Sequence, residues 1–182
     1  MTVVLITPRR SPKTIYNDGG RLAAGFKGDA GDCVARSIAI AAQLPYRQVY
    51  DELATINAIT PKSKRRRSSS LGKVTASHGI YTKSAVFKRY MACLGFVWTP
   101  TMGIGTGCKV HLRKDELPMG RIIVALSKHY AAVIDGVVHD THDPSRSGTR
   151  CVYGYWSKPE GARFIAGSGG IELAQMTMGT DL

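Results

Sequence analysis

The chain has 182 residues, 43% of them hydrophobic, and a formal net charge of +12 at pH 7. This length is typical of one domain with its own core, and the hydrophobic fraction excludes a wholly disordered chain. The longest apolar runs are too short to cross a bilayer, and the first residues lack the basic segment and long apolar region of a signal peptide. We therefore expect one soluble domain over residues 1–182, in the cytoplasm and with no membrane partner.

The N-terminal half of the sequence predicts one short strand and three helices. Residues 2–6 are apolar and typical of a strand, whereas the stretch 16–31 is rich in glycine and aspartate and should be irregular. Apolar residues then recur at helical spacing in three segments, which predict helices over 33–43, 46–57 and 82–94. The first of these has few polar side chains, so we expect it to be central and largely buried.

A basic run lies between the second and third predicted helices. It begins at Lys62 and is followed by serines, and the stretch 60–79 as a whole predicts a long exposed loop. One interpretation is a solvated loop, and the other is a surface that attracts nucleic acid or an acidic protein. No base-reading motif accompanies the run. The side chains that would make such contacts are Lys64, Arg65, Arg66 and Arg67.

Beyond Gly95 the sequence changes to patterns typical of β-strands. Two apolar runs flank an Asp-Gly pair at 135–136, which is the strongest short-range signal for a β-hairpin. Helices followed by antiparallel strands indicate an α+β domain, with a core over about residues 14–157 and a loosely packed tail over 158–182. The predicted strands cover residues 96–98, 109–112, 120–126, 129–134, 137–141 and 151–156.

Four cysteines are scattered along the chain without the paired spacing of a zinc finger or a redox motif. In a chain without a signal peptide, reduced thiols are expected in preference to disulfides. The spacing does not favour a metal site built from His111, His139 and His142 with a cysteine, so we expect no metal and no other cofactor. Cys93, on the third predicted helix, is interpreted as structural. The four are Cys33, Cys93, Cys108 and Cys151.

Cys33 has the position of a reactive cysteine, at the start of the first predicted helix. Asp32 is a good N-cap residue, so the thiol should lie in the first turn, near free backbone N–H groups and the positive end of the helix dipole. Both features favour the thiolate, which is the nucleophilic form. The alternative is that Cys33 is part of the core as a small hydrophobic residue, which is the usual role of a free cysteine.

The predicted hairpin supplies a histidine base and selects its carboxylate partner. With a two-residue turn at 135–136, alternation along the strands places the side chains of His129 and Asp140 on one face, within reach of each other. Asp135 lies at the tip of the turn, on the order of 20 Å from His129 at ~3.3 Å per residue. We therefore expect Asp140 to orient His129 as a base, and His139 to point to the opposite face.

These motifs resemble the papain-like cysteine peptidase superfamily, and in particular small papain-like proteins encoded by bacteriophages and prophages. The likeness is carried by G-D-C-x-x-R-S-I-A at 31–39, by H-Y-x-x-V-I-D-G at 129–136 and by D-T at 140–141. It implies a papain-like fold, in which N-terminal helices with the nucleophile at a helix start pack on a C-terminal antiparallel sheet.

The resemblance also implies a Cys-His-Asp catalytic triad on Cys33, His129 and Asp140. The protein would be a thiol hydrolase that acts on a peptide, isopeptide or amide substrate, in the host cytoplasm or in the virion. Such enzymes commonly place a glutamine before the cysteine for the oxyanion hole, and residues 27–29 offer none. The hole would then combine the backbone N–H of the cysteine with a group from the residues that precede it. The candidates are Asp29, Gly31 and Asp32.

Two aromatic residues, Trp98 and Tyr130, are candidates for the substrate groove, although large aromatic side chains are more often part of a core. The alternative to an enzyme is a papain-like module that binds or inhibits a host protein or nucleic acid without turnover, because a fold does not determine an activity. The net positive charge would favour an acidic partner for such a module.

Overall fold

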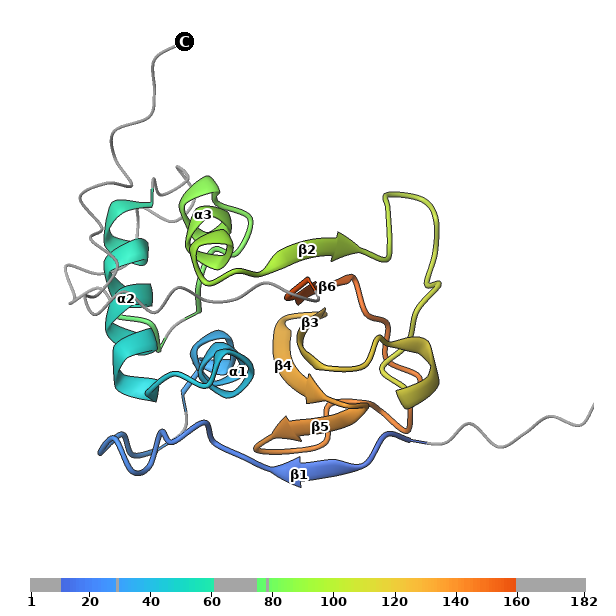
Figure 1. The fold of residues 1–182 in the computed structure, drawn as a ribbon, viewed down its shortest axis with the longest axis horizontal. Helices are drawn as coiled ribbons and strands as arrows, with labels where there is room; N and C mark the ends of the chain where they lie inside the picture. Colours follow the sequence, from blue (N-terminus) through green and yellow to red (C-terminus); the bar gives the residue numbers. More distant parts are fainter. Residues whose placement is uncertain (1–10, 29, 61–74, 78, 160–182) are drawn as a thin grey trace, which may run out of the picture.

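A six-stranded mixed sheet, covered on one face by three α-helices, forms the part of the chain that the structure describes (Figure 1). This computed structural model describes residues 11–28, 30–60, 75–77 and 79–159. Across the sheet the strands follow the order β1-β5-β4-β3-β6-β2. The α+β class expected from the sequence is confirmed. The strands are β1 (Thr14–Tyr16), β2 (Val97–Pro100), β3 (Arg121–Leu126), β4 (His129–Ile134), β5 (Val137–Asp140) and β6 (Gly154–Ser157).

The three helices lie close to the segments that the apolar spacing predicts. They are α1 (Cys33–Ala42), α2 (Tyr46–Ile59) and α3 (Ala85–Cys93). α1 is buried along most of its length, as its composition predicts. α3 begins later than the predicted start at residue 82, because the Ser84 side chain accepts a hydrogen bond from the backbone N–H of Phe87 and caps the helix there.

The hairpin of β4 and β5 has the register that the Asp-Gly turn predicts. Ile134 lies opposite Val137, and the two turn residues between them have positive φ, 50° for Asp135 and 76° for Gly136. A tight two-residue hairpin turn of this type requires a positive φ at both positions. The consequence is that the first residue of β4 and the last residue of β5 lie near each other, at the same end of the sheet as the start of α1.

β1 corrects the prediction of a purely antiparallel sheet, because it pairs with β5 in parallel. The strand has only three residues, and Ile15 and Tyr16 expose 41% and 73% of their surface. No alternation of buried and exposed residues therefore marks it in the sequence. Directly after β1, the backbone N–H of Asn17 donates to the carbonyl oxygen of Asp140, which fixes the loop before α1 beside the end of β5.

Both faces of the sheet are buried, which explains why the central strand β3 is an almost unbroken apolar run. Ile123 points to the helices and packs in a core that they share with Ala132 and Trp156. Val124 points to the other face, which is covered by a segment that includes Leu112 and by further apolar residues. The second core consists of Leu112, Leu117, Ile122, Val124, Leu126, Ala131, Val133, Val138 and Val152.

Two predictions about the cysteines are wrong. Cys108 and Cys151 form a disulfide with their Cα atoms 5.7 Å apart, beside a β-bridge between His111 and Cys151. Spacing along the sequence cannot show this pairing, since it depends on two distant segments that meet in the fold. Cys93 is exposed, because the buried face of α3 is formed by other residues. They are Phe87, Tyr90 and Met91.

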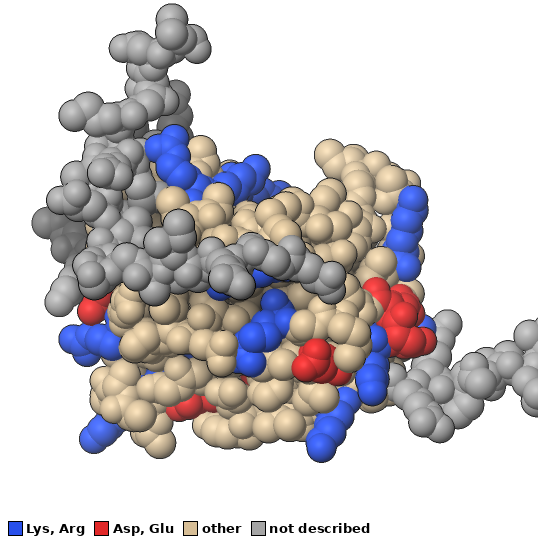
Figure 2. Space-filling model, viewed as in Figure 1, with Lys and Arg blue, Asp and Glu red and all other residues tan. Residues whose placement is uncertain are grey.

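Several predicted features lie outside the described residues. These are the strand at 2–6, residues 61–74 and 78 of the predicted loop 60–79, with Lys64, Arg65, Arg66 and Arg67, and residues 160–182 of the predicted tail 158–182. On the face shown in Figure 2, lysine and arginine side chains lie at several separate places and not in one continuous patch. In the part of the chain that the structure describes, each helix is too short or too polar to cross a bilayer.

Gly154 offers a test of the packing between β6 and β2. A Cβ at this position would lie 2.3 and 2.5 Å from two ring carbons of Trp98, whose ring packs against Trp156 at 5.2 Å between centroids. We expect Gly154→Ala to lower the free energy of unfolding by about 1–3 kcal/mol, because the added Cβ would also lie 2.8 Å from the Thr99 carbonyl oxygen, a backbone atom of the paired strand. Urea unfolding measures this change.

Gly103→Ala is the control for this prediction. Its added Cβ would lie 3.3 Å from the Thr106 methyl group, on an exposed loop that can adjust. Equal stabilities of the two variants would contradict the tight packing at Gly154.

Candidate active site

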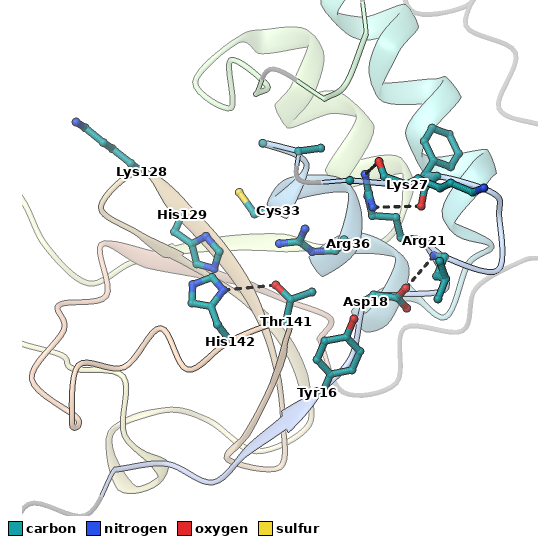
Figure 3. A pocket seen from close by; sticks show the side chains of 15 residues that line it. Tyr16, Asp18, Arg21, Lys27, Cys33, Arg36, Lys128, His129, Thr141 and His142 are labelled. Carbon is teal, nitrogen blue, oxygen red and sulfur yellow. Dashed lines mark hydrogen bonds between the residues drawn. The ribbon is translucent and has the colours of Figure 1, made fainter.

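Cys33 is the first residue of α1 and lies at the edge of a pocket of about 670 Å³ (Figure 3). The thiol is free and partly buried. At this position it is surrounded by first-turn N–H groups that have no acceptor within the helix, at the positive end of the helix dipole. The structure therefore places Cys33 where the sequence predicts it.

His129 begins β4 and links the thiol to a carboxylate. Its Nε2 atom lies 2.6 Å from Oδ2 of Asp140, and its side chain also hydrogen-bonds to Cys33. Because Nε2 faces the carboxylate, Nδ1 is the ring nitrogen left for the thiol. Asp135 lies at the tip of the hairpin, where its carboxylate accepts a hydrogen bond from the backbone N–H of Gly120 at 2.9 Å. The structure thus pairs His129 with the aspartate that strand alternation selects.

The three groups shift one another's pKa values toward an ion pair. Burial raises the pKa of the Cys33 thiol, but the hydrogen bond and charge of His129 outweigh it, and the net shift is downward. The backbone N–H of Tyr130 and the charge of Arg36 act in the same direction. Burial lowers the pKa of His129, yet its hydrogen bonds to Asp140 and Cys33 raise it to about 9. The favoured state is a thiolate beside an imidazolium.

Asp140 is a buried carboxylate, only 4% exposed, that is held in its ionised form. Its Oδ1 atom accepts a hydrogen bond from the backbone N–H of Thr141 at 2.7 Å and lies 3.6 Å from Nη2 of Arg36. Burial raises its pKa, but the bond from His129, the Thr141 amide and the Arg36 charge together lower it. The negative charge is therefore available to orient and stabilise the imidazolium.

Asp32 does not cap α1 with its side chain, which corrects the sequence interpretation. Its carboxylate turns into the protein, where Oδ1 accepts a bond from Nη1 of Arg36 at 2.5 Å. Oδ2 accepts bonds from Nε of Arg21 at 2.7 Å and from the hydroxyl of Tyr46 at 2.5 Å. We call these four residues the Asp32 cluster. Since the carboxylate is an acceptor that is already bound, it contributes no donor to an oxyanion hole.

The chain before Cys33 forms a wall of the pocket and is fixed by the same cluster. Arg21 also donates from Nη1 to the carbonyl of Phe26 at 3.2 Å and from Nη2 to that of Lys27 at 3.0 Å. Gly31 passes close to the backbone at 77, where a Cβ would lie 3.0 Å from the Ser77 carbonyl oxygen. Gly31 is therefore explained by this close approach. Asp29 lies outside the described residues.

The pocket has polar and basic residues on both sides of Cys33, with apolar side chains in the preceding loop (Figure 3). Lys128 and His129 lie on the side of the sheet, and Arg21 and Lys27 lie on the side of the loop. A substrate would thus meet more positive than negative side chains. The lining residues are Tyr16, Asp18, Arg21, Leu22, Phe26, Lys27, Gly28, Ala30, Gly31, Cys33, Arg36, Lys128, His129, Thr141 and His142.

The two aromatic groove candidates do not line this pocket. Trp98 is partly buried and packs on β2 against Trp156 of the helical core and over Gly154 of β6. Tyr130 packs partly buried against the helical core, and its side chain hydrogen-bonds to Thr82. Tyr130 contributes to the site through its backbone N–H. Burial and the nearby Cys33 charge also raise the pKa of its hydroxyl.

Sequence reasoning missed the arginine that connects the parts of the site. Arg36 is buried, with 9% of its surface exposed, and it lies between the carboxylates of Asp32 and Asp140. Its signal in the sequence was the spacing of four residues from Asp32, which places opposite charges on one side of a helix. Arg21 and Tyr46 carried no comparable signal, because they reach Asp32 from other segments.

A second histidine lies over the first at the mouth of the pocket. The rings of His142 and His129 are 5.1 Å apart between centroids, and His142 is exposed. With Asp140 they form a group whose possible metal-ligating atoms lie within 4.8 Å of one another. His129 uses Nε2 on Asp140 and its side chain on Cys33, so a metal at this place would disrupt the arrangement described above. His139 is not part of this group: its Nδ1 atom lies 3.4 Å from Nδ2 of Asn17.

Comparison with protein-family models, with curated proteins and with solved structures finds no match for the chain. The resemblance to papain-like peptidases therefore depends on the sequence motifs alone.

The thiol of Cys33 should react faster than that of Cys93 in mildly acidic solution. The lowered pKa of Cys33 leaves a larger thiolate fraction, and the raised pKa of His129 keeps the imidazolium partner charged up to about pH 9. We expect iodoacetamide at pH 5.5–6, mapped by mass spectrometry, to alkylate Cys33 first. His129→Ala should move the pH profile of this reaction upward. Cys93, the exposed free cysteine, is the internal control, and equal rates for both thiols would contradict the ion pair.

The Asp32 cluster should contribute strongly to stability. Asp32→Asn removes the charge that the buried Arg36 and the partly buried Arg21 face, and loss of one partner from a buried ion pair costs about 3–5 kcal/mol. Thermal or urea unfolding measures the effect. Asp51→Asn is the matched control, because its pair with Arg47 is exposed and should change stability by no more than about 0.5 kcal/mol. Similar small effects for both variants would refute the role of the cluster.

Proposed function

We propose that the protein is a cysteine hydrolase that cleaves peptide, isopeptide or other amide bonds through an acyl-enzyme. The observation that carries this proposal is the continuous contact from Cys33 through His129 to Asp140 at the edge of a pocket. A papain-like fold and an origin in a bacteriophage or prophage are part of the same proposal, and the sequence motifs support them.

The first half of the reaction forms a thioester. The Cys33 thiolate attacks the carbonyl carbon of the bound substrate, and the carbonyl oxygen becomes an oxyanion. The free N–H groups in the first turn of α1, that of Cys33 among them, stabilise this charge. The His129 imidazolium then donates its proton to the leaving nitrogen as the carbon–nitrogen bond breaks. The amine product departs, and the acyl group stays on Cys33.

The second half of the reaction releases the acyl group. Neutral His129 takes a proton from water, and the resulting nucleophile attacks the thioester. The carbon–sulfur bond breaks, the carboxylic acid product leaves, and the proton on His129 restores the ion pair with the thiolate. Asp140 keeps the ring of His129 in the same orientation in both halves, through the 2.6 Å contact to Nε2.

Loss of Cys33 should abolish turnover without unfolding the protein. We expect Cys33→Ala to give no acyl adduct in intact-mass spectra, while His129→Ala lowers kcat/KM by a factor of about 10² to 10⁴. The assay uses purified protein and a panel of peptide, isopeptide and amide substrates with fluorogenic leaving groups. Cys93→Ser, which changes the other free cysteine, should keep full activity.

If the wild-type protein hydrolyses no substrate of that panel and forms no acyl adduct on Cys33, the proposal of a hydrolase is refuted. The protein would then be the alternative, a module that binds an acidic protein or nucleic acid without turnover, which its net charge of +12 favours.

A further inference from the structure

A second group of metal-ligating side chains shares no residue with the triad. Cys108 and His111 belong to the long yellow-green connection between β2 and β3, and Cys151 precedes β6 (Figure 1). One ligand atom from each of the three residues lies within 4.8 Å of the others. Ligand atoms in a tetrahedral zinc site lie about 3.5–3.8 Å apart, as follows from Zn–S and Zn–N bonds of about 2.3 and 2.0 Å. Once the Cys108–Cys151 disulfide is broken and the two sulfur atoms move apart to this spacing, the three side chains would occupy three corners of such a site.

The surroundings of His111 favour a metal ligand over a simple surface histidine. Its Nδ1 atom lies 3.0 Å from Oε2 of Glu116, and the same carboxylate accepts the backbone N–H of His111 at 2.6 Å. Arg113 holds the other oxygen of Glu116 through a 2.7 Å ion pair. This leaves Nε2 of His111 free to bind a metal. A metal-bound histidine commonly donates its second ring N–H to a carboxylate that is itself fixed, which is the arrangement found here.

We propose that Cys108, Cys151 and His111 bind one zinc ion when the two cysteines are reduced. Two thiolates and an imidazole are a ligand set that zinc prefers, and they leave one position for water or another small donor. Cys108 is exposed, so the ion has a direct path from solvent. A disulfide between the two cysteines does not require a histidine beside it that is oriented by a carboxylate, as His111 is by Glu116.

Zinc and the disulfide are alternative states of the same two sulfur atoms. Two thiol groups of a cellular reductant such as glutathione break the Cys108–Cys151 bond, and the reductant is oxidised to its own disulfide. Cys108 and Cys151 become thiols and lose their protons to solvent as the zinc–sulfur bonds form. Each state holds the connection between β2 and β3 to the segment before β6.

Zinc binding to the fully reduced, metal-free protein tests the proposal. A phosphine reductant that does not bind zinc keeps the cysteines reduced, and competition with a chromogenic chelator gives the affinity and the stoichiometry. Cobalt(II) in place of zinc reports sulfur ligands through its thiolate charge-transfer band. We expect one ion per chain in the wild-type protein, and loss of this site in Cys108→Ser and Cys151→Ser.

Two further variants keep the test valid if a cysteine variant fails to fold. His111→Ala should lose the site, and Glu116→Gln should weaken it by about 10- to 100-fold, because the carboxylate only orients the ligand. Circular dichroism verifies the fold of each variant. Cys33→Ser and Cys93→Ser are the matched cysteine controls and should bind zinc as the wild-type protein does.

The other group of possible metal ligands, which includes two residues of the triad, defines the result that would contradict the proposal. Binding that is lost in His142→Ala and unchanged in His111→Ala would assign the ion to His129, Asp140 and His142, and would overturn the proposal. Reduced protein that binds no zinc at micromolar concentrations would overturn it as well. Neither result depends on the hydrolase activity, since the readouts are metal content and absorbance.

Discussion

One buried carboxylate joins the segments that meet at the candidate site. Asp32 receives bonds from Arg21 in the preceding loop, from Arg36 in α1 and from Tyr46 in α2. A carboxylate that leaves water without partners costs several kcal/mol, so burial of this group is tolerable only while all three segments stay in place. The position of the pocket wall relative to Cys33 is therefore coupled to the stability of the fold.

Arg36 extends this coupling to the base of the proposed reaction. It lies between Asp32 and Asp140, and its positive charge lowers the pKa of both Asp140 and Cys33. One buried guanidinium thus stabilises two anions that the chemistry needs, the thiolate and the carboxylate that orients His129. Burial opposes the imidazolium, but the hydrogen bonds and charges of Asp140 and Cys33 outweigh it, and the pKa of His129 is raised.

Local patterns in the sequence predicted the parts of the site that depend on short-range geometry. The Asp-Gly turn fixed the hairpin register, and alternation then selected Asp140 over Asp135 as the partner of His129. Helical spacing placed Cys33 at the start of α1. These inferences succeeded because each depends on one helix or one hairpin.

The parts that the sequence did not predict depend on contacts between distant segments. The parallel pairing of β1 with β5 and the meeting of Cys108 with Cys151 have no local signal. Asp32 was interpreted as a cap because it stands directly before the helix. In the structure its carboxylate instead accepts hydrogen bonds from Arg21, Arg36 and Tyr46. The role of Trp98 was ambiguous for a similar reason, since an aromatic side chain suits a groove as well as a core, where such side chains are more common.

The separation of Cys33 and His129 along the chain has a consequence for biosynthesis. The thiol is made early and its base is made late, after α3, β2 and β3. Until β4 and β5 pack against α1, Cys33 lacks the hydrogen bond and the charge that lower its pKa, and it behaves as an ordinary cysteine. In an unfinished or unfolded chain the Cys33 thiol is therefore no more reactive than other cysteines, and the reactive thiolate forms only when folding is complete.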